Sequence, residues 1–462
     1  MTAPERSERL TRTEYVGYAL GDTASNFFFQ TFNIFLTYYY VDVWGLTASA
    51  IAWMIPLVRF ADSVADPVMG IIADRTETRW GKFRPYLLWM AIPYGVCGYL
   101  IFASPDLSAS GKLAYAYATY LLMMFAYTGI NVPYSSLLGV LSPSSKVRTT
   151  ASSFRFVGAF GGGLLISLLV RPLVKYLGAG NELQGFQRTM AFFAAASVLL
   201  FWVSFATTRE RVTPPKGQQT NVKAELRELL GNRPWVIMLL TAIFSTTFIV
   251  LRSGSTLFYF KYYLHDDGTP ILFGQLDRVS VFLSAGMASM MLGTACVGLF
   301  AASRDKRTLA IALSLITGVC FASFFLLPKE QYGLLLVVNC VGTFCMGPTS
   351  ALVWAMYADV ADYGEWKFGR RSTGLVYSAS LFALKTGTAI AGWLLPVFLD
   401  RFGFVSNALQ GERALLGILL AFSLLPGLFA GLKAAALWAY PLHGGEVERI
   451  ERELQLRRAA AA

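Results

Sequence analysis

Three charged residues, Arg59, Asp62 and Asp66, lie inside the apolar run Thr47–Ala73, which is long enough to cross a lipid bilayer. Inserting a charged side chain at the middle of a membrane costs roughly 2.5–3.5 kcal/mol of free energy. Three of them on one segment therefore indicate that they are compensated by other groups and have a function. At helical pitch they fall within an arc of about 60°, and the two aspartates lie roughly 6 Å apart along the helix axis. This pattern predicts a cation site within a membrane rather than a lipid-facing helix.

The rest of the sequence supplies the elements that must position this site. The chain has 462 residues, of which 55% are hydrophobic and 15% are charged, whereas a soluble chain of this length carries about 25% charged residues. Apolar stretches of roughly 20 residues recur from end to end, which predicts an all-α membrane protein with twelve transmembrane helices. The helices are expected near residues 15–41, 47–73, 85–104, 113–141, 150–177, 187–208, 234–263, 279–302, 308–328, 331–358, 373–399 and 413–440.

The net charge of +11 is distributed unevenly along the chain. Lysine and arginine concentrate in the segments that share one side of the predicted membrane with the N-terminus, which is the positive-inside pattern. We therefore expect a multi-pass protein of the plasma (inner) membrane with both termini in the cytoplasm, and no nucleic-acid binding. The 5 cysteines and 2 histidines lack metal-site spacing, so no metal or other cofactor is expected.

The longest polar stretch, Arg209–Pro234, divides the predicted helices six and six. The two halves also resemble each other weakly, since a Tyr-Tyr pair followed by an aspartate ends both the first and the seventh predicted helix. This organisation predicts the major facilitator fold, with two pseudo-symmetric six-helix bundles and substrate bound between them. The expected domains are 1–208 for the N-terminal bundle, 209–233 for a cytoplasmic central loop, 234–440 for the C-terminal bundle and 441–462 for a cytoplasmic tail, in which Glu446–Arg458 is predicted to form a solvated charged helix.

A polar stripe follows the first predicted helix. Its members fall within an arc of about 80° and are Asp22, Asn26, Gln30, Asn33 and Thr37. Hydrogen bonding between helices is one explanation for such residues in a membrane. An unbroken stripe that includes an acid favours the other explanation, which is a water-filled cavity.

Several segments together resemble the glycoside–pentoside–hexuronide:cation symporters, whose best-known branch is the melibiose permeases. The most specific matches are Arg59–Gly70, which continues through Asp74-Arg75 to Arg79–Pro85, and Ala358–Glu365. Further matches are Leu20–Asp22, Tyr38–Val43, Arg148–Arg155 and Lys385, so the resemblance runs through both halves. It implies a secondary active transporter, not an enzyme, that imports a glycoside, pentoside or hexuronide with H⁺ or Na⁺ by alternating access.

The resemblance implies that Asp62 and Asp66 bind the coupling cation, and that the Thr128 hydroxyl faces the same site. Two carboxylates one helical turn apart supply oxygen ligands for a dehydrated Na⁺, and a proton can substitute by binding to one of them. Where the melibiose branch has an asparagine between the acids, this chain has Ala65. One side-chain oxygen is therefore missing, and H⁺ and Na⁺ coupling both stay open. Arg59 is interpreted as the counter-charge of the acids or, alternatively, as a substrate contact.

The predicted substrate site combines the two halves of the chain, and its residues are Asp22, Asn26, Gln30, Asn131, Arg155, Lys385 and Trp354. Asp22 has the carboxylate that holds two sugar hydroxyls, but the acid of the melibiose branch aligns with Asn26, so both are retained. Asn131 and Ser135 stand where that branch has an acid and a tryptophan, which argues against α-galactoside specificity. Trp354 or Tyr134 is then the alternative stacking face.

Arg155 matches a family arginine at the sugar site. Lys385 and Asp359 would face the same cavity from the second half, or would form a charge pair that locks one conformation.

Charged residues on the cytoplasmic side of each half are predicted to form salt bridges that stabilise the outward-open state. They are Asp74, Arg75, Arg79, Lys82, Asp362, Glu365, Arg370 and Arg371.

Two rival functions follow from the same residues. The first is a carrier of lysolipids or other amphiphiles with the same fold, against which the polar stripe of the first helix argues. The second is a membrane phosphotransferase that holds Mg²⁺ with the Asp62-x-x-x-Asp66 pair, but such enzymes need more acids at helical spacing, and the residue four after Asp74 is Thr78. The expected partners are a small-molecule sugar and membrane lipids, and the protein is expected to be monomeric.

Overall fold

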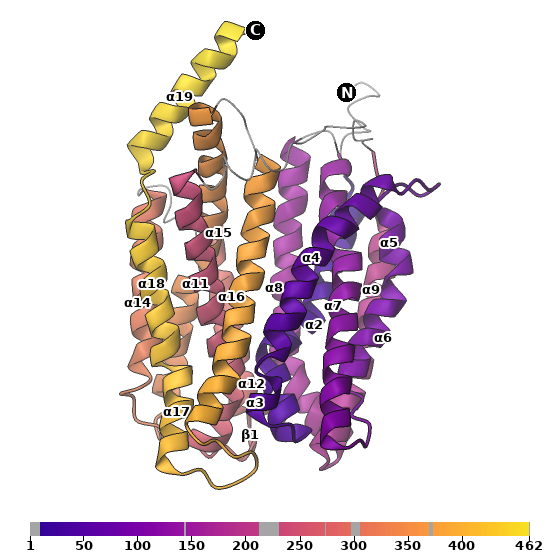
Figure 1. Ribbon diagram of the computed structural model, residues 1–462, viewed down its shortest axis with the longest axis vertical. Coiled ribbons are helices and arrows are strands. Elements are labelled where there is room, and N and C mark those ends of the chain that lie inside the picture. The colour runs from indigo at the N-terminus through magenta and orange to yellow at the C-terminus, as the bar shows by residue number, and fades with distance from the viewer. Residues whose placement is uncertain are drawn as a thin grey trace. The chain divides into compact units, whose positions relative to one another are not determined.

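The computed structural model describes residues 10–142, 145–211, 231–272, 274–296, 305–368 and 373–461. Backbone packing separates the chain into two compact units, which are built almost entirely from helices (Figure 1). The first unit comprises Met1–Gly217, Gly268–Ser284 and Ser406–Ala408, and the second comprises Gln218–Asp267, Ala285–Val405 and Leu409–Ala462.

The first unit consists of long helices that pack along their lengths. In chain order its elements are α2 (Arg12–Tyr38), the π-helical segment η1 (Tyr39–Val43), α3 (Ala48–Ile51), α4 (Met54–Arg75), α5 (Arg84–Trp89), α6 (Ala91–Ile101), α7 (Ala109–Val140), α8 (Ser145–Gly178) and α9 (Glu182–Thr207). The short antiparallel strands β1 (Pro270–Leu272) and β2 (Leu276–Asp277) and the start of α12 (Arg278–Ala295) also belong to it. Helix α2 packs against α8 and α9, and α4 packs against α7.

The second unit contains the remaining helices, which are α11 (Arg233–Phe258), η2 (Tyr259–Tyr263), the rest of α12, α14 (Lys306–Ser323), α15 (Tyr332–Phe368), α16 (Thr373–Arg401), α17 (Glu412–Phe422), α18 (Leu424–Trp438) and α19 (Gly444–Ala461). Helix α11 packs against α16 and α18, and α14 packs against α15 and α18. Polar residues fix the helix starts, because the side chains of Asn232 and Asp305 accept hydrogen bonds from otherwise unpaired N–H groups of α11 and α14.

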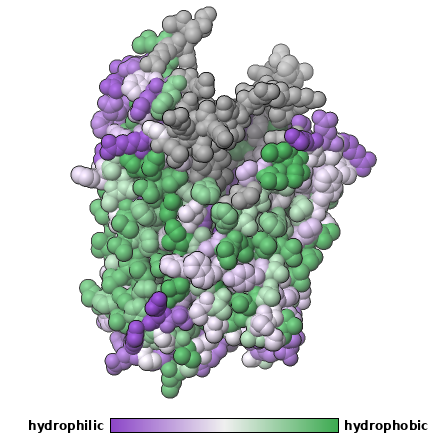
Figure 2. Space-filling view, viewed as in Figure 1, coloured by the Kyte–Doolittle hydropathy of each residue, from purple (hydrophilic) through white to green (hydrophobic). Residues whose placement is uncertain are grey.

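Within the described residues, nine helical stretches are long and apolar enough to cross a membrane. The other three predicted spans coincide with α2, with the pair α5 and α6, and with α12. Large apolar side chains such as Leu57, Phe60 and Ile71 on α4 are exposed, and apolar residues cover much of the face seen in Figure 2. Lipid, unlike water, accommodates such a surface without cost.

Helix α19 is not a solvated tail, so that sequence-based expectation was wrong. Ile450 and Leu454, one helical turn apart, are buried against the end of α15. The indole N–H of Trp366 on α15 donates to the Glu453 carboxylate at 2.6 Å, and the Arg449 guanidinium lies over the same ring. The two apolar residues were the available signal, and the surrounding charges masked it.

A dipeptide after α9, Glu210-Arg211, ties together one end of the first unit. The Glu210 carboxylate accepts the backbone N–H groups of Lys82, Phe83 and Arg84 at 2.7–2.9 Å, which are unpaired donors at the start of α5. The Arg211 guanidinium donates to Glu14 of α2 at 2.7 Å, and its backbone N–H donates to the Val140 carbonyl of α7. Gly81, at φ 109°, leaves room for the carboxylate, because a Cβ there would lie only 2.4 Å from it.

We expect Glu210→Gln to lower the thermal midpoint of the purified protein. The amide keeps the shape but replaces a carboxylate oxygen by a donor that faces N–H donors, and such a change costs about 1–3 kcal/mol. Thermal unfolding in detergent measures the effect. Asp106→Asn, a neutralisation at an exposed site of the same unit, is the matched control, and equal midpoints for the two variants would contradict the anchoring role.

Candidate functional site

Helices α4 and α7 bring Asp62, Asp66 and Thr128 together. The Thr128 hydroxyl oxygen lies 2.6 Å from Oδ1 of Asp62 and 2.9 Å from Oδ1 of Asp66. Asp62 and Thr128 are buried, whereas Asp66 is partly exposed. A hydroxyl group has a single proton to donate, so it satisfies only one of the two carboxylates at a time. The Thr128 hydroxyl alone therefore does not satisfy both carboxylates.

Arg59 lies one helical turn before Asp62 and is also buried. Its Nη1 atom is 3.8 Å from Oδ2 of Asp62, the oxygen that faces away from Thr128, and Tyr120 of α7 contacts the guanidinium. In this conformation Arg59 and Asp62 form an ion pair, and both the counter-charge role and the substrate contact stay predictions.

A second ionic pair joins α2 and α8. The Arg155 Nε atom donates to Oδ2 of Asp22 at 2.8 Å, and its Nη2 atom donates to the Ser135 hydroxyl at 3.3 Å. The guanidinium lies over the Tyr134 ring, with 5.1 Å between Cζ and the ring centroid. Its side chain is 25% exposed and that of Asp22 is 12% exposed, so the pair is accessible to a small polar solute.

The Tyr134 ring is itself held rigidly. It stacks on Tyr18 with ring centroids 4.8 Å apart, and its hydroxyl donates to the Tyr18 carbonyl. A Cβ at Gly21 would lie 2.5 Å from the ring, so only glycine allows this approach of α2 to α7. Tyr134 therefore forms a fixed aromatic platform beneath the Asp22–Arg155 pair.

The polar stripe of α2 serves partly to join helices. Ser25, next to the stripe, donates to the Asn131 side-chain carbonyl at 2.9 Å, and the Asn131 amide donates to the Tyr127 carbonyl. The Asn26 amide donates back to the Asp22 carbonyl at 2.9 Å. Gln30 is half-buried, whereas Asn33 and Thr37 are buried. The hydrogen bond from Ser25 to Asn131 joins α2 to α7, and Ser25 is a partner that the sequence pattern did not indicate. The water-filled cavity stays a prediction.

The second unit carries the other predicted substrate residues. Lys385 on α16 is half-buried, and Trp354 on α15 packs edge-on against Tyr357, with ring centroids 5.7 Å apart. Both carboxylate oxygens of Asp359 accept from Lys306, at the start of α14, at 2.9 Å. Lys306 was absent from the sequence interpretation, because a pairing across 53 positions leaves no local pattern.

The predicted gating residues have varied surroundings. Arg75 is exposed, Arg79 stacks on the neighbouring Trp80 with 4.5 Å to the ring centroid, and the Lys82 backbone is bound by Glu210. Asp362 and Glu365 are half-buried on α15. The Asp74 side chain and the residues Arg370 and Arg371 lie outside the described part of the structure.

A family model described as MFS/sugar transport protein matches residues 17–444. The chain belongs to this family. A putative glycoside/cation symporter of Escherichia coli (strain K12) is 38% identical over 98% of this chain and 96% of its own length. The isoprimeverose transporter of Lactiplantibacillus pentosus is 32% identical over 95% of this chain and 89% of its own length.

Solved structures agree on the fold. A crystal structure of a D-xylose–proton symporter superposes with a TM-score of 0.63 at 13% sequence identity, over 93% of this chain and 99% of that chain. As a member of the MFS/sugar transport family the chain is a multi-pass membrane transporter and not an enzyme, which excludes the magnesium phosphotransferase. The lysolipid carrier is not favoured either, because the relatives are named for glycosides and sugars.

The ligands at the cation site suit a hard ion or a proton. Carboxylate and hydroxyl oxygens bind alkali and alkaline-earth cations, whereas transition metals prefer imidazole or thiolate ligands. The described residues contain no cluster of three or more histidine, cysteine or acidic side chains. These oxygen atoms therefore suit a proton or a hard cation such as Na⁺.

We expect Thr128→Val to weaken cation binding about tenfold, because it removes a hydrogen bond to a charged group while preserving side-chain shape. The cation concentration that gives half-maximal uptake in proteoliposomes measures this change. Thr128→Ser keeps the hydroxyl and is expected to retain most of the affinity. Equal cation affinity in wild type and Thr128→Val would contradict the proposed contact.

We expect Asp22→Asn and Arg155→Gln to act on stability and on uptake in different ways. Each single change leaves the other charge without its partner and lowers both the thermal midpoint and the uptake rate. The double variant is expected to recover part of the midpoint, because no charge is stranded, while uptake stays more than about tenfold below wild type. Midpoints that fall additively would show that the two side chains do not stabilise each other.

Proposed function

We propose that this protein imports a glycoside, pentoside or hexuronide together with H⁺ or Na⁺ by alternating access. The observation that carries the proposal is the Thr128 hydroxyl within hydrogen-bond distance of both Asp62 and Asp66. Two carboxylates this close can share one small cation, either a proton or a metal ion. The electrochemical gradient of this cation is then the source of energy for transport.

The substrate site is formed by Asp22 and Arg155 over the Tyr134 platform. A carboxylate and a guanidinium side by side accept from and donate to adjacent sugar hydroxyls, and the buried Tyr134 ring holds the guanidinium in place. Asn131 acts through Ser25 to position α2, and Asn26 orients the Asp22 backbone. Gln30 is part of the same proposal, and Lys385 and Trp354 are proposed as the substrate contacts of the second unit.

The two sites communicate through α7. Thr128 and Asn131 lie three residues apart on this helix, and Asn131 is bonded to α2, which carries Asp22. A cation that draws α4 and α7 together therefore also adjusts the spacing of α2 and α7 at the sugar site. This arrangement makes solute affinity depend on cation occupancy, as symport requires.

The proposed architecture has twelve transmembrane helices in two pseudo-symmetric bundles, residues 1–208 and 234–440, joined by a cytoplasmic loop at 209–233 and followed by the tail 441–462. Both termini are proposed to be cytoplasmic, and the transporter is proposed to act as a monomer. The gating role of Asp74, Arg75, Arg79, Lys82, Asp359, Asp362, Glu365 and Arg370 is part of the same proposal. Asp359 is paired with Lys306 in this conformation, so its participation requires that this pair breaks.

We expect Asp66→Asn to abolish uptake of solute against its concentration gradient. Movement of solute down its own gradient is expected to remain. The amide removes the charge that the cation compensates but keeps the sugar site intact. Proteoliposomes with an imposed pH gradient or Na⁺ gradient, tested with isoprimeverose, a glucuronide and melibiose, identify both the ion and the solute class. Asp106→Asn is the control for loss of an exposed charge. Uptake that ignores both gradients, or concentrative uptake at wild-type rate by Asp66→Asn, would refute the coupling mechanism.

A further inference from the structure

A buried lysine in the second unit has no role in the mechanism described above. Lys433 lies in the middle of α18, and 1% of its surface is exposed. Its Nζ atom donates to the Thr349 hydroxyl of α15 at 3.0 Å and lies 5.6 Å from the centroid of the Phe248 ring of α11. The Thr349 hydroxyl already donates to the Met346 carbonyl at 2.7 Å, so it can only accept from the lysine. No carboxylate bonded to Lys433 occurs among the described residues.

The surroundings of Lys433 are poorly suited to an ammonium group. A charged lysine has three N–H donors, and the hydrogen bonds found in the described part of the chain satisfy one of them. Burying a charge without compensation is far more costly than burying a neutral amine with one unmet donor. The contacts therefore fit an uncharged amine.

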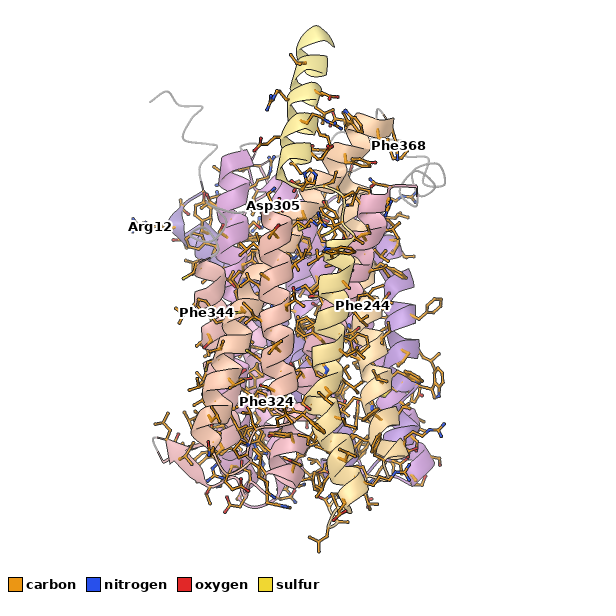
Figure 3. The ribbon with its side chains drawn as sticks, turned by 90° about the vertical axis from the view of Figure 1, so that its left-hand side faces the viewer. Arg12, Phe244, Asp305, Phe324, Phe344 and Phe368 are labelled. Atoms are coloured by element: carbon orange, nitrogen blue, oxygen red, sulfur yellow. The ribbon has the colours of Figure 1, made fainter. Side chains whose placement is uncertain are left out.

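A second buried polar group, on α14, lies at about the same height along the helix axes as Lys433. Ser314 of α14 is buried, and its hydroxyl has no hydrogen-bond partner among the described residues. Helices α14 and α18 run antiparallel, since a Cβ at Gly318 would contact Ala430 and the Arg307 side chain donates to the Leu437 carbonyl. This register brings Ser314 to the height of Lys433. In Figure 3, Asp305 and Phe324 mark the two ends of α14 between which this level lies.

Arg252, the other buried cation of the second unit, shows how a permanent charge is accommodated here. Its guanidinium carbon lies 3.4 Å, 4.2 Å and 4.7 Å from the ring centroids of Phe422, Phe324 and Phe321, and its Nη1 atom donates to the Phe422 carbonyl at 2.6 Å. Three aromatic faces and a carbonyl stabilise a cation well. Lys433 has one hydroxyl and one more distant ring, so it lacks an equivalent environment.

Charged groups on the neighbouring helices do not offset a charge on Lys433. On α11, Arg252 follows Phe248 by one turn, roughly 6 Å along the axis, and it is a cation that opposes protonation. On α15, Asp359 lies ten residues beyond Thr349, roughly 15 Å along the axis, and is paired with Lys306. The other titratable or charged residues of α11, α14, α15 and α17 are Arg233, Lys306, Arg307, Cys320, Tyr332, Cys340, Cys345, Tyr357, Asp362, Tyr363, Glu365, Lys367, Glu412 and Arg413.

We propose that Lys433, with Thr349 and Ser314, is a second proton-binding site, separate from the Asp62–Asp66 pair. The amine is uncharged while the core of α11, α14, α15 and α18 is closed around it, and it binds a proton from water when that core opens. Acid pH then favours the open state and alkaline pH favours the closed state. The site thereby makes the conformation of the second unit sensitive to pH.

The sign of the stability effect follows from proton linkage. An unfolded or opened chain holds the Lys433 proton more readily than the closed core does, so the stability of the closed state rises as pH increases. Substitution by methionine, which is apolar and of similar length, removes this dependence. We expect the thermal midpoint of Lys433→Met at pH 6 to be higher than that of wild type by about 2 °C or more. This difference in midpoint is expected to shrink as the pH rises towards 9.

The experiment measures thermal midpoints in detergent from pH 6 to pH 9 for wild type, Lys433→Met and Lys433→Arg. Lys329→Met, at an exposed position of the same unit, is the matched control and should follow the wild-type curve. Lys433→Arg carries a permanent charge and is expected to have a lower midpoint than wild type at every pH. Wild-type and Lys433→Met curves that run parallel, a Lys433→Met protein that does not fold, or a Lys433→Arg protein as stable as wild type would each overturn the proposal.

In transport, we expect the rate of gradient-free solute exchange between pH 7 and pH 9 to depend less steeply on pH in Lys433→Met than in wild type, because the Asp62–Asp66 pair is the same in both. This arm rests on the proposed function. The thermal arm does not, because it requires neither solute nor coupling cation. If the thermal midpoints of wild type and Lys433→Met diverge with pH but no solute exchange is found, the Lys433 site is supported and the proposed substrate is wrong. If exchange is found but the two thermal curves run parallel, the Lys433 site alone is refuted.

Discussion

The cost of an uncompensated charge in an apolar interior is the constraint on which the first unit depends. Among the described contacts, Arg155 on α8 pairs with Asp22 on α2, and Arg59 pairs with Asp62 one turn along α4. The Thr128 hydroxyl of α7 lies within hydrogen-bond distance of both Asp62 and Asp66. These contacts join α4 to α7 and α2 to α8. The two acids on α4 share this hydroxyl, and we propose that a small cation binds between them.

The buried charged side chains of the second unit have three different kinds of surroundings. Asp359 has an ionic partner in Lys306, and Arg252 is surrounded by aromatic faces. Lys433 has neither, and this difference matters because lysine can lose its proton whereas arginine cannot. The three residues show that burial alone does not identify a functional group. What distinguishes Lys433 is a titratable side chain whose surroundings suit only one of its two protonation states.

Sequence periodicity was sufficient to predict features that depend on one helix. The facing of Asp62 and Asp66 follows from their spacing of four, and the apolar runs predicted helices that the structure contains. Pairings between distant segments were not predictable in this way. The bond from Lys306 to Asp359, the support of α5 by Glu210 and the contact of Ser25 with Asn131 each depend on which helices are neighbours. The burial of helix α19 was not predicted for a related reason. Two apolar residues among many charges indicate burial only when the surface that they pack against is known.

Asn131 links α7 to α2 through its amide group and brings no charge of its own. An acid at this position would add a negative charge between the two helices. The amide instead accepts from Ser25 and donates to the Tyr127 carbonyl, so it adds no charge and holds α2 against α7. Helix α7 thereby links Thr128 to α2, which carries Asp22. The Asp22–Arg155 pair, which we propose as the substrate contact, is neutral overall and donates as well as accepts.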